Sequence, residues 1–459
     1  MRALALMLWL VWLPAAQAAG GTVHEFELDN GLQILVKADH RAPVVVSQIW
    51  YKVGASYERA GLTGISHVLE HMMFKGTEAH PAGEFSRIIS RHGGQENAFT
   101  GRDYTAYFQK LAERHLEVSL RLEADRMRNL LLQPEEFGKE IQVVMEERRL
   151  RTEDQPRSLT HEHFNAIAHP AAPYGQPVIG WMDDLRHMSV EDLRAWYRRW
   201  YAPNNATLVV VGDVDPEAVR RLAEEHFGPL EPSTLEPLDR RPTLTQRGPR
   251  RITVRAPAEL PYLIMGYKVP VLATAAKPWE AYALEVLAGV LDGGDSARLP
   301  RRLVRGTEVA ASAGASYDLY ARLDSVLGLD GTPAPGKTLE AVERALREEV
   351  RRLRAEPVAA EELERVKAQV VADDVFQRDS MFYQALEIGM LETVGLGWEV
   401  MDRYVERIRA VTAEQVQEVA RKYLTDGRLT VAVLEPQPVE GRARRPADAA
   451  EVGGPSPIH

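Results

Sequence analysis

The second half of this 459-residue chain repeats the sequence pattern of its first half. Three pairs of segments carry the repeat: Tyr51-Lys52-Val53 with Tyr267-Lys268-Val269, 189–200 with 412–423, and 208–211 with 429–433. Their offsets are 216, 223 and about 222 residues, so a unit of about 210 residues occurs twice. We therefore predict an α+β fold of two homologous units, each with a mixed, largely antiparallel sheet and helices on one face.

The N-terminus has the pattern of an export signal. Arg2 precedes an almost wholly apolar run from Ala3 to Ala16, and Ala16-Gln17-Ala18 forms an A-x-A cleavage site. The apolar run of about 14 residues is short for a membrane span, so an uncleaved anchor is the second interpretation. We expect residues 1–18 to be a cleaved signal peptide and the mature chain to be periplasmic.

The composition of the rest of the chain indicates domain boundaries and excludes several kinds of partner and site. We expect an N-terminal α+β domain over 19–228, a Pro-rich polar linker over 229–250, a homologous α+β domain over 251–436, and a disordered tail over 437–459. The net charge of -10 argues against a nucleic-acid partner. The chain has no Cys, which excludes disulfides, thiolate zinc sites and cysteine catalysis.

The segment His67-Val68-Leu69-Glu70-His71 reads H-x-x-E-H, with apolar neighbours at helical spacing. Positions i and i+4 share one face of a helix, so both imidazoles can reach one metal ion. Two imidazoles beside a carboxylate that is not a ligand are typical of hydrolytic zinc sites, and this order is that of the inverzincins. The competing interpretation is a pair of solvated histidines in a chain with 13 His.

A catalytic zinc ion usually has three protein ligands, so a third ligand is required. Acidic candidates lie on the helix expected to begin at Pro134, namely Glu140, Glu146 and Glu147. Glu140 and Glu147 lie on one face by i, i+7 spacing. Spacing alone does not decide between Glu146 and Glu147, and a solvated charged helix remains the simpler interpretation of these residues.

The chain resembles the pitrilysin/insulinase clan of inverted zinc peptidases. Within that clan it is similar to the short-chain group that includes the mitochondrial processing peptidase and bacterial processing-type proteases. The resemblance covers nearly all of the mature chain and rests on five segments, namely 67–77, Asn97-Ala98-Phe99-Thr100, 140–147, 174–180 and 201–208.

This resemblance implies roles for individual residues. It makes Glu147 the third ligand of one Zn²⁺ per chain, and Glu140 an auxiliary catalytic residue that supports the ligands. Glu70 would accept a proton from the attacking water. Asn97 and Ala98 would lie on an edge strand that pairs with the peptide main chain.

The predicted function is an exported zinc-dependent endopeptidase that acts on peptides or unfolded polypeptide segments through a Glu-activated water on zinc. The alternative is a non-catalytic structural or binding subunit of a peptidase-like complex. The intact set of His67, Glu70, His71 and Glu147 argues against that alternative. The sequence does not distinguish general peptide degradation from the maturation of one dedicated peptide.

One departure from the family pattern bears on partners. Active members usually carry an Arg and a Tyr seven residues apart in the second half, but Val304 and Ala311 stand at these positions here. We therefore expect a heterodimer with a homologous subunit that lacks H-x-x-E-H and carries the Arg/Tyr pair, with a homodimer as the alternative. The competing interpretations are a shifted alignment, or the use of Tyr317 or Tyr320 instead of the pair.

Overall fold

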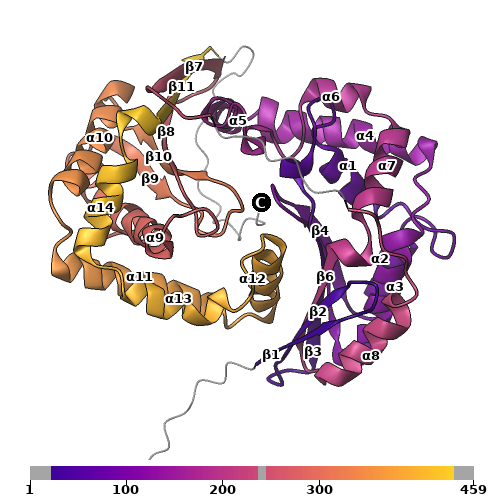
Figure 1. Cartoon of the computed structure of the whole chain (residues 1–459). Coiled ribbons are helices and arrows are strands. Elements are labelled where there is room, and N and C mark those ends of the chain that lie inside the picture. The colour runs from indigo at the N-terminus through magenta and orange to yellow at the C-terminus, as the bar shows by residue number, and fades with distance from the viewer. Residues whose placement is uncertain (1–21, 236–243, 439–459) are drawn as a thin grey trace, which may run out of the picture.

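The computed structural model describes residues 22–235 and 244–438. The expected signal peptide, part of the expected linker and nearly all of the expected tail lie outside the described residues. The described chain forms two α+β units, drawn from indigo to magenta and from magenta to yellow in Figure 1. Each unit has its own sheet and its own main core. This arrangement confirms the predicted fold class.

Six strands form the sheet of the first unit, in the order β1-β2-β6-β3-β5-β4. They are β1 (Val23–Glu27), β2 (Gln33–Ala38), β3 (Val44–Tyr51), β4 (Gln95–Thr100), β5 (Thr105–Ala112) and β6 (Ala206–Gly212). β2 and β6 are parallel, and the other neighbours are antiparallel. Among the described strands, β4 pairs only with β5 and is therefore an edge strand.

Five strands form the second sheet, in the order β7-β11-β8-β10-β9. They are β7 (Arg250–Pro257), β8 (Tyr262–Val269), β9 (Ala310–Ser316), β10 (Ser325–Pro333) and β11 (Leu429–Gln437). This order matches β2-β6-β3-β5-β4, with β7 and β11 as the parallel pair. Tyr51 pairs with Ala206 and Tyr267 pairs with Leu429, so the two sheets share one register. The internal duplication is thus visible strand by strand.

Helices of each unit cover one face of its sheet. The first unit contains α1 (Ile65–Met72), α2 (Glu84–Arg91), α3 (Leu116–Arg128), α4 (Pro134–Arg148), α5 (Pro156–Ala168), α6 (Met182–His187), α7 (Val190–Trp200) and α8 (Pro216–Phe227). The second contains α9 (Pro278–Asp292), α10 (Leu339–Ala355), α11 (Ala360–Gln377), α12 (Met381–Thr393), α13 (Val400–Arg409) and α14 (Ala413–Tyr423). The matched helices α7 and α14 both begin with a capping box, at Ser189 and Thr412.

The two units exchange helices across their second faces. α12 of the second unit packs on β3 and β6, and α5 of the first unit packs on β7 and β11 (Figure 1). Gly389 allows α12 to lie close to the sheet, since a Cβ there would meet Nε1 of Trp50 at 2.1 Å. Each sheet is therefore covered on both faces, which joins the two units.

A polar contact also joins the units. Arg322, in the loop between β9 and β10, donates from Nε to Oδ1 of Asp103 at 3.0 Å and from a terminal nitrogen to Oγ of Ser56 at 2.7 Å. Tyr174 donates to the other oxygen of Asp103. Asp103 is only 4% exposed, so this ion pair holds the loop against the turn between β4 and β5. None of the described helices is long and apolar enough to cross a membrane.

Candidate metal centre and active site

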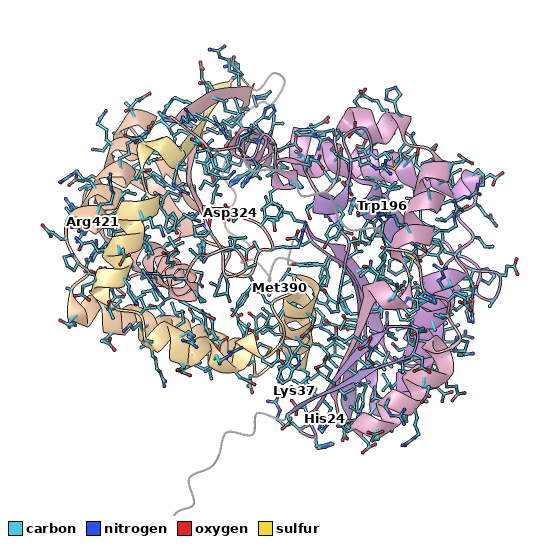
Figure 2. All side chains as sticks on the ribbon, viewed as in Figure 1. His24, Lys37, Trp196, Asp324, Met390 and Arg421 are labelled. Carbon is cyan, nitrogen blue, oxygen red and sulfur yellow. The ribbon has the colours of Figure 1, made fainter. Side chains whose placement is uncertain are left out.

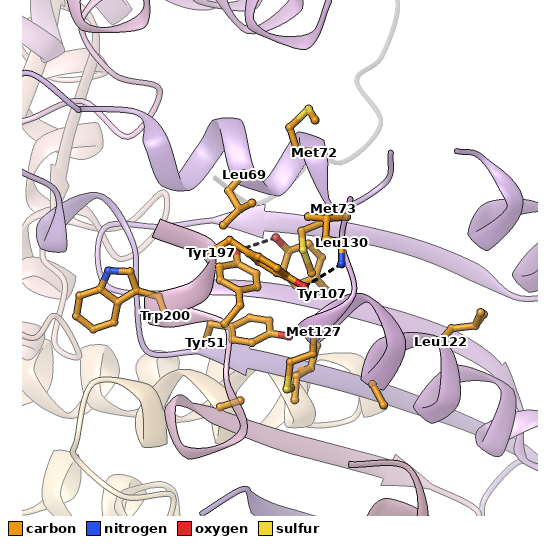
Figure 3. Packing of buried hydrophobic residues seen from close by; sticks show 14 of the residues in the cluster. Tyr51, Leu69, Met72, Met73, Tyr107, Leu122, Met127, Leu130, Tyr197 and Trp200 are labelled. Atoms are coloured by element: carbon orange, nitrogen blue, oxygen red, sulfur yellow. Dashed lines mark hydrogen bonds between the residues drawn. The ribbon is translucent and has the colours of Figure 1, made fainter. Parts of the chain in front are cut away.

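The helix α1 presents one apolar face and one polar face. Val68, Leu69 and Met72 are fully buried in the core of the first unit. Figure 3 shows Leu69 and Met73 directed at a group of aromatic rings that includes Tyr107 and Tyr197. The burial of this face turns His67, Glu70 and His71 to the opposite side.

The start of α1 is held by a buried carboxylate. Glu58, which is 0% exposed, accepts hydrogen bonds from the backbone N–H groups of Gly64 at 2.7 Å and Ser66 at 2.9 Å. Its oxygens satisfy orphan N–H donors at the helix N-terminus, while burial raises the pKa of Glu58 to about 8. Gly64 has a φ of +88° and touches Gly180 closely enough to leave no room for a Cβ. These contacts fix the position of the histidine helix.

His67, His71 and Glu147 come together although they lie on two helices, α1 and α4. Their ligand atoms all lie within 4.8 Å of one another. Oε2 of Glu147 is 3.8 Å from Nε2 of His67 and 3.4 Å from Nε2 of His71. One carboxylate oxygen and two Nε2 atoms therefore converge on a single point.

The neighbouring carboxylate does not share this position. Glu146 is exposed and its Oε2 pairs with Arg149 at 2.7 Å. The other oxygen of Glu147, Oε1, pairs with Arg151 at 2.7 Å, which leaves Oε2 for the histidines. The geometry thus favours Glu147, where spacing alone left both residues open.

Glu140 lies two turns before Glu147 on α4, and it contacts the far side of His71. Its Oε2 is 3.2 Å from Nδ1 of His71, and its Oε1 is 2.6 Å from Nζ of Lys75. A carboxylate on Nδ1 fixes the ring orientation and the tautomer that leaves Nε2 free to act as a ligand. Lys75 in turn fixes the carboxylate.

Glu70 lies beside the ligand face and contacts the edge strand β4. Oγ1 of Thr100 donates to Oε2 of Glu70 at 2.5 Å. Burial raises the pKa of Glu70, while the Thr100 hydrogen bond and the charge of His71 oppose that rise. A carboxylate with a raised pKa is suited to accept and return a proton near neutral pH.

The charges of the candidate ligands are coupled. Burial alone would raise the pKa of Glu147, but the hydrogen bond to His71 and the charges of His67, Arg151 and His71 lower it to about 2. Burial alone would lower the pKa of His71, but Glu147, Glu70 and Glu140 outweigh burial and raise it. Glu147 is therefore ionised, and protons would compete with a metal ion at His71.

These residues open onto a large cavity between the two units. The cavity has a volume of about 1480 Å³, and His67, Glu70, His71 and Glu147 line it. Asn97 and Ala98 line it from β4. Helix α12 and the loop between β9 and β10 close the opposite side. An extended peptide can reach both β4 and the histidine helix in this space.

The structure also shows residues that the sequence did not single out. Thr100, Lys75 and Arg151 contact Glu70, Glu140 and Glu147 respectively. The sequence carried only a weak signal for them, because Thr100 and Lys75 lie within the segments that resemble the family but had no assigned role.

The two residues at the Arg/Tyr positions do not reach the cavity. Val304 ends the short helical segment η6 (Pro300–Val304), and Ala311 is exposed on β9. Neither is among the residues that line the cavity. Tyr320 does line it, whereas Tyr317 donates its hydroxyl to the carbonyl oxygen of Pro270 at 2.8 Å.

The donor set fits zinc. Two imidazole nitrogens and one carboxylate oxygen are the three protein ligands of many catalytic zinc sites, which keep a further position for water or substrate. The side of the cluster that faces the cavity leaves such a position accessible. The Glu140 contact to Nδ1 of His71 is the supporting interaction that ligating histidines usually have.

Comparison with known proteins identifies the family of the chain. The model for insulinase (peptidase family M16) matches residues 33–180, and the model for the peptidase M16 inactive domain matches residues 187–370. The zinc protease PqqE of Helicobacter pylori is 31% identical over 441 residues, which cover 93% of this chain and 96% of that protein.

Solved structures of two proteins share the fold of this chain. A crystal structure of a protease from Helicobacter pylori has a TM-score of 0.85 at 30% identity and covers 91% of this chain and 100% of that chain. The first half of the periplasmic protease PqqL from Escherichia coli shares the fold, with a TM-score of 0.75 at 19% identity over 90% of this chain and 91% of that one. The chain belongs to the insulinase/pitrilysin-type M16 peptidase family.

Proposed function

We propose that this chain is an exported zinc-dependent endopeptidase that hydrolyses peptides or unfolded polypeptide segments. The observation that carries the proposal is the convergence of Nε2 of His67, Nε2 of His71 and Oε2 of Glu147, beside Glu70, on one wall of the cavity. Relatives named zinc proteases support the reaction class.

The chemistry follows from the positions of the side chains. A zinc ion held by His67, His71 and Glu147 would supply Lewis-acid chemistry that polarises a peptide carbonyl and makes water more acidic. Glu70 accepts the proton of the attacking water and returns it to the leaving amine. Thr100 holds the Glu70 carboxylate in place through its 2.5 Å hydrogen bond. Glu140 keeps His71 in the orientation that ligation requires.

Substrate binding is expected at the free edge of β4. An unpaired edge strand binds an extended main chain by β-addition, with little demand on the peptide sequence. Asn97 and Ala98 lie in the middle of this strand and line the cavity. A peptide added to the edge would therefore run past Thr100 and Glu70, so unfolded segments are better substrates than folded domains.

Export is supported by the signal-like N-terminal sequence and by the fold shared with a periplasmic protease. Mass spectrometry of the N-terminus after expression in a bacterial host tests it. A mature chain that begins at Ala19 in the periplasmic fraction is the expected result. A chain that keeps Met1 and remains in the cytoplasm would contradict export and would leave the peptidase proposal intact.

The side chains of Val304 and Ala311 have no hydrogen-bond donor, which supports a heterodimer over a homodimer. A homologue without H-x-x-E-H would contribute an Arg/Tyr pair over the metal site, where such donors stabilise the developing oxyanion. Size-exclusion chromatography with a peptidase assay on each fraction tests this. Activity only in fractions that contain both chains is expected. Full activity of this chain alone would favour the homodimer or a monomer, in which Tyr320, a residue that lines the cavity, would take the place of the pair.

A zinc assay separates the enzyme from the alternative, a non-catalytic binding subunit. The unmodified chain is expected to hold zinc at one ion per chain, Glu147→Gln to lose it, and Glu146→Gln to keep it. The two substitutions are the same and lie one residue apart, so they control for charge and helix content. Absence of zinc from the unmodified chain would remove the enzyme proposal, and loss only in Glu146→Gln would reverse the ligand assignment.

A further inference from the structure

The cavity wall formed by α12 carries a row of apolar side chains. Phe382, Leu386 and Met390 lie four residues apart on α12, and Val394 follows at its C-terminal end. All four line the same cavity as the candidate metal ligands. Met390 lies on the part of α12 that faces the middle of the molecule (Figure 2). The first three side chains are only partly buried, so they offer apolar surface to whatever enters.

This row borders the face that holds α12 on the sheet. Ala385, Ile388 and Leu391 are fully buried and belong to the cluster formed with Trp50 and Val209 of the first unit. Phe382, Leu386 and Met390 pack against the border of this cluster and are only partly buried, so each also turns part of its surface to the cavity. The part of these three side chains that faces the cavity is available to contact a ligand.

The edge strand β4 connects the row to the proposed peptide site. Successive side chains of a strand point to opposite faces of the sheet. Thr100 points to the metal side, where it contacts Glu70. Phe99 points to the α12 side, where its ring lies 5.4 Å from that of Trp50.

Phe108 continues the α12 side of the sheet. It pairs with Asn97 across the β4–β5 ladder, and its ring lies 4.8 Å from that of Phe382, in an edge-to-face arrangement. Nζ of Lys110 lies 4.0 Å from the Phe382 ring and places a positive charge at this end of the row. Phe108 of β5 and the apolar side chains of α12 thus form one continuous apolar surface.

A peptide added to β4 would alternate in the same way as the strand. Residues that point to the metal side would meet Glu70 and the histidines, and the residues between them would point toward α12. We propose that Phe382, Leu386 and Met390, with Phe108, form a subsite for large apolar side chains of an extended peptide. The subsite rests on the proposed peptidase function, and it gives that peptidase a preference for peptides with apolar residues at alternate positions.

The test measures binding and does not need turnover. Two fluorescein-labelled twelve-residue peptides of equal composition are compared by anisotropy on the zinc-loaded full-length Glu70→Gln protein. In one peptide, leucine and serine alternate, and in the other they stand in blocks of two. The alternating peptide is expected to bind ~10-fold more tightly or better, because burial of each apolar side chain typically changes affinity by that order.

Two variants locate the effect. Phe382→Ser and Met390→Gln, each made in the Glu70→Gln protein, are expected to abolish the difference between the two peptides. Phe376→Ser is the matched control, since Phe376 is 76% exposed on α11 and does not line the cavity. Thermal unfolding checks that each variant is folded. The two α12 variants change side chains of different size and polarity, so the same result in both supports the subsite.

The outcomes separate the subsite from the enzyme. Loss of the preference in both α12 variants, with the control unchanged, supports the subsite. The subsite proposal is overturned if the Glu70→Gln protein binds the two peptides equally. It is also overturned if neither Phe382→Ser nor Met390→Gln changes the preference. If the preference behaves as expected while the unmodified protein, with or without a partner subunit, hydrolyses neither peptide, the subsite stands and the peptidase proposal fails.

Discussion

Nδ1 of His71 lies 3.2 Å from Oε2 of Glu140, and this contact directs the other ring nitrogen, Nε2, at Glu147. Lys75 binds the second oxygen of Glu140 at 2.6 Å. A chain of charged contacts therefore runs from Lys75 through Glu140 and His71 to Glu147. The imidazole cannot rotate without breaking this chain, so contacts within the protein orient the His71 ring.

Glu140→Gln is expected to weaken zinc binding without abolishing it. The amide can accept a hydrogen bond from His71 but has no charge to support the ligand, and such losses usually cost ~10–100-fold in affinity or activity. Competition with a chelator measures the affinity. Glu146→Gln on the same helix is the control and should be unchanged. An unchanged affinity for Glu140→Gln would show that the contact does not support a ligand.

As the solution is acidified, zinc affinity is expected to begin to fall at a pH above the usual pKa of histidine. The surrounding carboxylates raise the pKa of His71 above 6.5, so the proton that competes with zinc binds at a higher pH than for an ordinary histidine. Below that raised pKa, the apparent affinity should fall ~10-fold per pH unit for each proton taken up. Titration with a chelator at pH 6, 7 and 8 checks this, and a flat affinity over this range would contradict it.

Thr100→Val is expected to move the acid limb of the activity profile to higher pH. The hydrogen bond from Thr100 lowers the pKa of Glu70, so its removal lets burial raise that pKa further. Glu70 must be ionised to accept a proton, so activity is lost at a higher pH. The kcat/KM profile of the active assembly measures this, with Thr100→Ser as the control that keeps the hydroxyl. Identical profiles would show that Thr100 does not act on Glu70.

Arg322→Ala is expected to destabilise the joined units. Asp103 would remain buried without its cation, and breaking a buried pair from one side costs ~3–5 kcal/mol, at the low end here because Arg322 is 21% exposed. Chemical denaturation measures the change. Arg255→Ala is the control, because its pair with Glu435 is largely exposed and should contribute less than ~1 kcal/mol. Equal, small effects would show that Arg322 does not hold the two units together.

Much of the fold could be predicted because its signals are local. The strand and helix periodicities and the repeated segments predicted two α+β units, and the shared registers of Tyr51 and Tyr267 bear this out. The exchange of α5 and α12 could not be predicted. α12 is apolar on two faces, toward Trp50 and toward the cavity, and periodicity does not say which sheet a helix will cover.

Local sequence patterns likewise predicted only part of the candidate site. His67 and His71 lie one helical turn apart, so spacing alone placed them on one face. Glu146 and Glu147 are adjacent, and only the packing of α4 against α1 turns one toward the histidines and the other toward Arg149. The Thr100–Glu70 contact joins a strand to a helix 30 residues away, and no local pattern encodes it.

The central claim is that Glu70 acts as a base beside a zinc ion held by His67, His71 and Glu147. Its most direct test is Glu70→Gln, with zinc content and hydrolysis of a quenched peptide measured on the same sample of the active assembly. Zinc at the level of the unmodified protein with a ~10²–10⁴-fold loss of kcat is expected, because an amide cannot accept the proton of water. Full turnover with zinc retained would contradict the assignment of Glu70, and loss of zinc would make Glu70 part of the metal site.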